Sequence, residues 1–332
     1  MNVISLFSGA GGLDLGLKNA GTNIIWANDI DKDATETYKM NIDDNIVCED
    51  IKEINQKDIP DGDVIVGGFP CLGFTIAKGN CRDVLDDHNF LYLEYLRILK
   101  EKMPKLFLIE NVPGIKRGLS FKEFFTQMIN NFKNTGYNIK YETLRASNYG
   151  VPQNRDRVII VGMRNDLDYT FEFPKKTHED NPEPDIYNVT NKKLITIRDA
   201  IGDLPEDWNE KIPNHYGTKH KVKINNYVGN RKLDWDKPSP TIMGRGSRSG
   251  GPVIHPHPNL KRRLTIRECA RLQSFPDDFI FTGSNSAQYA QIGNAVAPLF
   301  GFRVSQQIMK ALNETPNEFN KNNWELPWND KI

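Results

Sequence analysis

The sequence predicts an α/β fold in which a parallel sheet is covered by helices on both faces. Five short apolar runs, typical of buried strands, alternate with helical patterns over the first 165 residues, at 3–7, 24–29, 63–68, 105–112 and 157–163. Such alternation favours parallel strands, and parallel sheets bind ligands beyond the carboxyl ends of their strands. Chemically versatile residues follow these runs directly, so we expect the functional site at that edge.

The character of the chain changes after about residue 170. Segment 177–185, THEDNPEPD, is typical of a linker, and residues 181–264 are irregular, basic and rich in turn formers. A helical pattern returns at Leu264, and a last helix is expected from about Leu299 to Leu312. We therefore expect a large domain over 1–180, a smaller domain over 181–284, and a return to the large domain over 285–332.

Composition limits the class of protein. A hydrophobic share of 38% indicates a globular chain, and no apolar run is long enough to predict a membrane span. The first residues lack the basic flank and long apolar core of a signal peptide, so a cytoplasmic protein is expected. The four cysteines form no CxxC pair, and neither a metal site nor a disulfide framework is expected.

Charge is distributed unevenly although the formal net charge is zero. Residues 29–63 hold twelve acidic residues and four lysines, whereas residues 215–267 hold twelve Lys or Arg and two acidic residues. The basic stretch fits a phosphate-binding surface and fits a solvated basic face equally well.

A glycine-rich turn follows the first predicted strand. Its sequence, FSGAGG at 7–12, would open a helix, and its glycines would let a ligand approach the backbone and the free N–H groups there. Asp29 ends the next run, where an acid can accept hydrogen bonds from ribose hydroxyls. The turn lacks the full G-x-G-x-x-G pattern, which favours a nucleoside cofactor without pyrophosphate over NAD. Glycine turns of this kind also arise from packing alone.

Three further motifs lie at the ends of predicted strands. Cys71 ends GGFPC and is either a reactive thiol presented by a loop or a small buried residue. Glu110 and Asn111 follow another run; a carboxylate there can share a proton with a bound base, or simply cap a helix or pair with a cation. Arg155 and Arg157 in QNRDR could clamp a phosphate, orient a carboxylate or lie in an exposed loop.

Taken in order, these motifs resemble the series found in the C5-type DNA cytosine methyltransferases of bacterial restriction–modification systems. The series reads FSGAGG, GGFPC, ENV, QNRDR, RRLTIRECARLQSFPDDF and QIGNAV, and it leaves only about residues 165–255 unmatched. Each motif is weak alone, but six in the right order are hard to obtain by chance. The resemblance implies a Rossmann-like S-adenosylmethionine-dependent methyltransferase domain with a smaller, irregular target-recognition domain.

The resemblance implies a role for each catalytic residue. Cys71 would attack C6 of a cytosine flipped out of duplex DNA, which makes C5 nucleophilic toward the methyl group of S-adenosylmethionine. Glu110 would hold N3 and the exocyclic amine as charge develops, and Asn111 would orient the loop. Arg155 and Arg157 would contact O2 of the base, the phosphate or Glu110.

The same resemblance implies the residues of the cofactor pocket. Asp29 would bind the ribose, where the family often has Glu, and Asp50 would bind the adenine amino group. The full expected set is Phe7, Gly9, Gly11, Gly12, Asp29, Ile30, Asp50, Ile51, Gly68, Pro70, Leu91, Asn294 and Val296.

Double-stranded DNA is the partner that the resemblance implies. Thr75 would lie near the target phosphate, and the glycine-rich stretch 240–251 would enter the major groove. There, Arg245 or Arg248 would read a guanine, because arginine can donate two hydrogen bonds to that base; both could equally bind phosphates. Leu72 stands where the family usually has Gln, which would affect flipping or strand reading rather than the thiol chemistry.

Three rival functions remain open at this point. An RNA cytosine-5 methyltransferase of the same fold is the nearest, and the long Gly/Arg-containing recognition region favours DNA over it. The incomplete glycine pattern and the late Asn294 element argue against a nicotinamide-dependent oxidoreductase. The full set of catalytic residues argues against a protein that only binds DNA. A monomer on bacterial nucleoid DNA, with a restriction endonuclease acting on the same site, is the expected setting.

Overall fold

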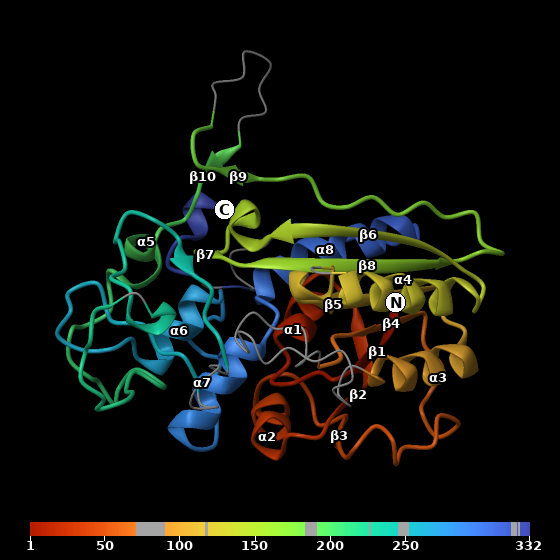
Figure 1. The fold of residues 1–332 in the computed structure, drawn as a ribbon, viewed down its shortest axis with the longest axis horizontal. Coiled ribbons are helices and arrows are strands. Elements are labelled where there is room, and N and C mark those ends of the chain that lie inside the picture. The colour runs from red at the N-terminus through yellow and green to blue at the C-terminus, as the bar shows by residue number, and fades with distance from the viewer. Residues whose placement is uncertain are drawn as a thin grey trace.

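A seven-stranded sheet forms the centre of the computed structural model, with strand order β3-β2-β1-β4-β5-β8-β6 (Figure 1). The structure describes residues 1–70, 90–116, 119–182, 191–225, 227–244, 252–319, 324 and 326–332, with the backbone alone at 119 and 120. The strands of the sheet are β1 (Asn2–Leu6), β2 (Asn23–Asp29), β3 (Ile46–Cys48), β4 (Val64–Gly67), β5 (Leu106–Asn111), β6 (Tyr137–Arg145) and β8 (Asp156–Arg164).

The sheet is parallel from β3 to β5, as expected, but its other end is not. β8 runs antiparallel to both β5 and β6. The chain leaves β6 at Arg145 and enters β8 at Asp156. A connection this short joins antiparallel neighbours, because parallel strands need a longer crossover. The expectation of a parallel sheet was therefore wrong for β8.

Helices cover both faces of the sheet, because alternate strand side chains point to opposite sides. On one face, α1 (Gly12–Asn19) and α8 (Pro298–Ala311) pack over residues such as Val3. On the other face, α3 (Tyr92–Lys102) and α4 (Leu119–Lys133) pack over residues such as Ile4. α2 (Lys32–Asn41) is capped by Asp31, whose side chain accepts a hydrogen bond from the Ala34 N–H.

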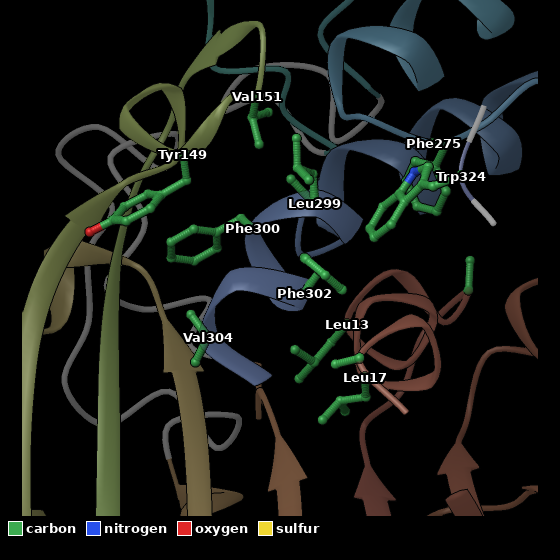
Figure 2. Packing of buried hydrophobic residues seen from close by; sticks show 14 of the residues in the cluster. Leu13, Leu17, Tyr149, Val151, Phe275, Leu299, Phe300, Phe302, Val304 and Trp324 are labelled. Carbon is green, nitrogen blue, oxygen red and sulfur yellow. The ribbon is translucent and has the colours of Figure 1, made fainter. Parts of the chain in front are cut away.

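α8 is the expected last helix, and it brings the end of the chain back to the sheet. Its Leu299, Phe300 and Phe302 lie between α1 and the β6–β8 side of the molecule (Figure 2). Gly16 of α1 makes the approach possible, since a Cβ there would lie 2.5 Å from the Pro298 carbonyl oxygen. The bounds of the three expected domains stay a prediction.

Short elements lie between β6 and β8 and between β8 and α8 along the chain. They are β7 (Gln153–Asn154) paired with β11 (Ser239–Pro240), β9 (His178–Glu179) paired with β10 (Lys192–Lys193), and the helices α5 (Ile197–Ile201), α6 (Ile266–Leu272) and α7 (Asn285–Asn294). Both α5 and α6 begin with a capping box, at Thr196 and Thr265. Of the helices described, none combines the length and apolar character that crossing a membrane requires.

The expected linker at 177–185 is wrong at its start, where β9 is anchored. His178 is buried, and its Nε2 lies 3.1 Å from the carbonyl oxygen of Lys331 near the end of the chain. Nearby, the buried Trp328 donates from its indole N–H to the Gly150 carbonyl at 3.1 Å. The C-terminal residues thus hold this segment against the body of the molecule.

Candidate active site

The turn after β1 has the geometry of a ligand cradle. Phe7, Gly9 and Gly11 all have left-handed backbone conformations, with φ of 54°, 55° and 86°. This conformation costs a non-glycine residue about 1–2 kcal/mol, so the strain at Phe7 is typical of a functional turn. Among the described residues, no atom lies within 4 Å of where a Cβ on Gly9 would stand, so none of them covers the turn at that point.

Asp29, at the end of β2, ties this turn to the neighbouring strand. Its carboxylate accepts hydrogen bonds from the Gly9 N–H at 2.7 Å and from the Asp31 N–H at 2.9 Å. Burial raises the pKa of Asp29, and these backbone hydrogen bonds oppose the rise. An acid fixed beside the open face of Gly9 fits the ribose of a nucleoside cofactor.

The opposite wall of the cradle comes from the other end of the sequence. A Cβ on Gly12 would lie 2.3 Å from the Val296 carbonyl oxygen, so the chain after α7 touches the turn directly. Asn294 is exposed at the end of α7. The structure therefore brings two of the expected cofactor residues, Asn294 and Val296, to the glycine-rich turn.

Other expected cofactor residues lie at the ends of β2, β3 and β4. Ile30 is 67% exposed, an unusual position for a large apolar side chain and one that suits contact with a ligand. Asp50 is half-buried and accepts a hydrogen bond from the Lys52 N–H, whereas Ile51 is buried. Beyond β4, Gly68 is half-buried and Pro70 is exposed; Leu91 precedes α3.

Glu110 and Arg157 form an ion pair at the end of β5. Arg157 Nε lies 2.6 Å from Glu110 Oε1, and about a tenth of each side chain is exposed. The pairing of β5 with β8 places Glu110 beside Ile159, so the arginine two residues earlier in β8 reaches the carboxylate. Burial lowers the pKa of Arg157, and the nearby Glu110 opposes this effect. The contact is one of those expected for Arg157.

Gly68 leaves room for this carboxylate. A Cβ on Gly68 would lie 3.1 Å from Glu110 Oε2, so a larger residue would press on the side chain. The glycine thus brings the chain that leads to Cys71 close to Glu110.

Asn111 holds the chain just before Cys71. Its side-chain amide donates to the Phe69 carbonyl at 3.2 Å, and its Oδ1 accepts from the Val112 N–H at 2.8 Å. The Phe69 ring is buried and packs near Tyr92 and Tyr95 of α3, at centroid distances of 6.3 and 6.4 Å. These contacts fit the expectation that Asn111 orients the loop.

Arg155 makes none of the contacts expected of it in the described structure. Its guanidinium is buried and donates to the main-chain carbonyls of Ile242 (2.8 Å), Gly293 (2.8 Å) and Ala295 (3.0 Å). Burial lowers the pKa of Arg155, and so does the charge of Arg157. In the described structure Arg155 supports the backbone behind the site, and Glu110 pairs with Arg157 instead. Contact of Arg155 with the base or its phosphate stays a prediction.

Two glutamines that we gave no role extend this support. Gln153 accepts a hydrogen bond from the Ile242 N–H at 3.0 Å and donates to Gln273 Oε1 at 3.0 Å; Gln273 donates to the Ile292 carbonyl at 2.7 Å. Both glutamines lie inside the motifs quoted above, but the sequence does not indicate whether a glutamine is buried and hydrogen-bonded or exposed to solvent. Cys71, Thr75, Arg245 and Arg248 lie outside the described residues.

The basic stretch 215–267 divides into exposed and internal residues. Lys219, Lys221, Lys223, Arg231 and Lys232 are exposed, and none of them forms an ion pair with another described residue. Three arginines instead donate hydrogen bonds to other protein groups: Arg262 to Glu268, Arg263 to Ile254 and Arg267 to Phe279. Whether the basic stretch is a phosphate-binding surface or a solvated basic face, fewer of its twelve Lys and Arg residues are available for it than the sequence indicated.

Comparison with a family model identifies the family of the chain. The model of the C-5 cytosine-specific DNA methylases matches residues 1–310. The chain belongs to this family. It is 39% identical over 339 residues to the Type II methyltransferase M.MthTI of Methanothermobacter thermautotrophicus, with 94% of this chain and 98% of that protein covered. It is 35% identical to M.FnuDI of Fusobacterium nucleatum, with 95% and 96% covered.

Solved structures agree with the family in fold. A prophage-encoded E. coli protein, described as a DNA modification methyltransferase, has a TM-score of 0.73 and 26% identity, covering 95% of this chain and 100% of that one. The S. pombe Dnmt2 methyltransferase has a TM-score of 0.65 and 24% identity, covering 94% and 99%. The second likeness concerns the fold alone.

Proposed function

This family member is a DNA cytosine-5 methyltransferase, and we propose the chemistry of its site. The protein takes a methyl group from S-adenosylmethionine and places it on C5 of a cytosine flipped out of a short, specific duplex sequence. The observation that carries this proposal is the convergence at one sheet edge: Glu110 paired with Arg157, and Asn111 bonded to Phe69, two residues before Cys71.

In the proposed reaction, Cys71 supplies the nucleophile. Its thiolate bonds to C6 of the ring, and the electrons of the C5–C6 double bond become available at C5. Glu110 holds N3 and the exocyclic amine and stabilises the charge that develops there, while Arg157 fixes the position of that carboxylate. After methyl transfer, a base removes the C5 proton, the double bond reforms and the thiolate leaves.

The residues around the glycine-rich turn fit S-adenosylmethionine. When bound, it supplies a methyl group carried on a positively charged sulfur. Asp29 would bind the ribose, Asp50 the adenine amino group, and the open face of Gly9 would admit the ligand to the backbone. The remaining contacts would come from Phe7, Gly11, Gly12, Ile30, Ile51, Gly68, Pro70, Leu91, Asn294 and Val296.

The proposed DNA surface consists of Thr75 and residues within 181–284. The exposed Lys219, Lys221 and Lys223 would contact phosphates, which fix position but carry no sequence information. Thr75 would lie near the target phosphate, and Arg245 or Arg248 would read a guanine. On this proposal the chain divides into catalytic residues 1–180, recognition residues 181–284 and the return at 285–332.

We also propose a setting for the enzyme. The relatives described above are named Type II methyltransferases, which supports a role beside a restriction endonuclease that acts on the same sequence. We expect a monomer bound to double-stranded DNA in the cytoplasm, on the nucleoid of a bacterial cell.

Bisulfite sequencing tests this function. Unmethylated duplex DNA is incubated with the purified protein and S-adenosylmethionine, converted and sequenced. We expect protected cytosines in one short, repeated sequence, which would also identify the site. Conversion of every cytosine by a folded protein that binds the cofactor would contradict the proposal. A second incubation with transfer RNA then tests the RNA alternative directly.

A further inference from the structure

The first residues of the stretch proposed to read DNA lie against the C-terminal end of α7. Ile242, Met243 and Gly244 are its last described residues, and Val253 is among the first after it. The Val253 N–H donates to the Met243 carbonyl at 3.0 Å, forming an antiparallel bridge. The two ends of the stretch are therefore held together at a defined place.

Gly244 and Gly293 are in direct backbone contact. A Cβ on Gly293 would lie 2.0 Å from the Gly244 nitrogen, and a Cβ on Gly244 would lie 2.3 Å from Asn294 Oδ1 and 2.6 Å from the Ala290 carbonyl oxygen. Packed atoms do not approach this closely, so any larger residue must move one backbone away from the other. Only a pair of glycines permits the contact as it stands.

Arg155 joins the same two segments by hydrogen bonds. One terminal nitrogen donates to Ile242, on the recognition side, and the other donates to Gly293 and Ala295, on the cofactor side. The Gln153 side chain also accepts a hydrogen bond from the Ile242 N–H. Losing these donors would take a hydrogen bond from each of the three carbonyls, and a buried carbonyl left without a partner costs its full desolvation energy.

The contacts continue to the glycine-rich turn. Gly293 is followed by Asn294, Ala295 and Val296, and the Val296 carbonyl lies against Gly12. A displacement of Gly244 would therefore pass through one short turn of chain to the cradle that binds the cofactor.

We propose that Arg155, Gly244 and Gly293 form one junction that positions Ile242–Gly244, where the stretch proposed to read DNA begins, together with the Asn294–Val296 turn. Gly244 and Arg155 are then positioning residues for the cofactor as well as for DNA. This inference rests on the proposed assignment of Asn294 and Val296 to the cofactor pocket.

Hydrogen exchange in the wild-type protein tests the junction without any substitution. S-adenosylhomocysteine is added in the absence of DNA, and exchange is followed by mass spectrometry. We expect exchange of the Ile242 and Val253 amides to slow by about threefold or more, with no change at Lys219–Lys223. Unchanged exchange at Ile242 and Val253, in a protein that binds the ligand, overturns the inference alone. If S-adenosylhomocysteine does not bind, the proposed cofactor site fails and this inference fails with it.

Variants supply the second test. Gly244→Ala is expected to raise the Kd for S-adenosylhomocysteine, measured without DNA, by about tenfold or more and to relax the methylated sequence. Arg155→Lys keeps the charge but cannot serve three carbonyls, and we expect the same two changes. In both variants KM for S-adenosylmethionine should rise more than kcat falls.

Gly217→Ala is the matched control. A Cβ on Gly217 would lie 2.3 Å from Tyr289 Oη, which is as close as a Cβ on Gly244 would come to Asn294 Oδ1. Tyr289 and Asn294 both belong to α7, but none of the atoms nearest to the Gly217 Cβ belongs to the Asn294–Val296 turn. We expect its Kd to stay within about twofold of the wild type. Folded Gly244→Ala and Arg155→Lys proteins with wild-type affinity and site preference would overturn the inference; should both fail to fold, the exchange experiment decides.

Discussion

The carboxyl end of the sheet and residues 181–284, the segment proposed to recognise DNA and called the recognition segment below, hold their backbones in place by different means. At the carboxyl end of the sheet, β5 is hydrogen-bonded to a neighbouring strand on each side, and Glu110 lies near the end of β5. In the recognition segment, arginines provide the support: Arg267 donates to the carbonyls of Pro213 (2.9 Å), Pro276 (2.8 Å) and Phe279 (2.8 Å). Irregular backbone leaves carbonyls without strand partners, and a guanidinium with five N–H donors can satisfy several at once.

The difference shows that basic composition and basic surface are separate properties. Arg263 likewise donates to the carbonyls of Gly229 (3.0 Å) and Ile254 (2.6 Å), and Arg262 pairs with the buried Glu268 at 2.7 Å. By contrast, Lys221 and Lys223 are exposed. In this segment the arginines named here stabilise the fold, and the exposed lysines are the candidates for DNA contact.

Removing an internal arginine tests this distinction most severely. Arg267→Met leaves three carbonyls without their donor, and we expect the free energy of unfolding to fall by about 3–5 kcal/mol. Arg231→Met, at an exposed position, is the control and should change it by less than about 0.5 kcal/mol. Urea unfolding of both variants makes the measurement, and equal losses would break the comparison.

A substitution at the sheet edge should affect activity more than stability. Glu110→Gln keeps the shape of the side chain but removes its charge, so the developing charge on the base loses its partner. We expect kcat to fall roughly 10²–10³-fold. Glu142→Gln, at an exposed position on β6, serves as the control. A kcat within about twofold of the wild type for Glu110→Gln would contradict the role given to Glu110.

The buried acid beneath the glycine-rich turn should make stability depend on pH. Asp14 accepts a hydrogen bond from Ser5 Oγ at 2.8 Å, and burial raises its pKa to about 6. Between about pH 4 and pH 6 the folded state keeps this proton while the unfolded chain has lost it, so stability falls as pH rises and is constant above that range.

Asp14→Asn should remove this fall, which amounts to about 3 kcal/mol. The difference in unfolding free energy between the variant and the wild type, measured from pH 4 to pH 7, should grow up to about pH 6 and then level off. A difference that does not change with pH would show that Asp14 is ionised throughout.

The smallest effects are expected from the exposed lysines. Replacing Lys219, Lys221 and Lys223 together by Ala should change the free energy of unfolding by less than about 0.5 kcal/mol. DNA binding should weaken for every sequence alike, and the slope of log affinity against log salt should become shallower by about one for each phosphate that the protein no longer neutralises. An unchanged slope would remove these lysines from the DNA surface.

Sequence reasoning found the elements that are buried on both faces and missed the sheet's edges. β1, β2, β4, β5 and β8 are continuous apolar runs, as expected of central strands. β3 has only three residues, and β6 is an edge strand whose side chains are mostly exposed, so neither carries such a run.

In the site, too, some contacts could be predicted from the sequence and others could not. The family resemblance gave Glu110 as one of three possible contacts of Arg157, and the antiparallel pairing of β5 with β8, which was not predicted, brings the two together. The direction of the Arg155 side chain could not be predicted, since it depends on carbonyls at Ile242, Gly293 and Ala295, far away in sequence.

Methylation of carbon 5 of cytosine in duplex DNA is proposed to proceed through Cys71. The most direct measurement is mass spectrometry of nucleosides from duplex DNA treated with the enzyme and methyl-labelled S-adenosylmethionine, beside Cys71→Ser and, as a control, Cys48→Ser. We predict label in 5-methylcytosine with the wild type and with Cys48→Ser, and a loss on the order of 10⁴-fold with Cys71→Ser. Label on a ring or exocyclic nitrogen would contradict methylation at C5, and undiminished label with Cys71→Ser would contradict the role of Cys71.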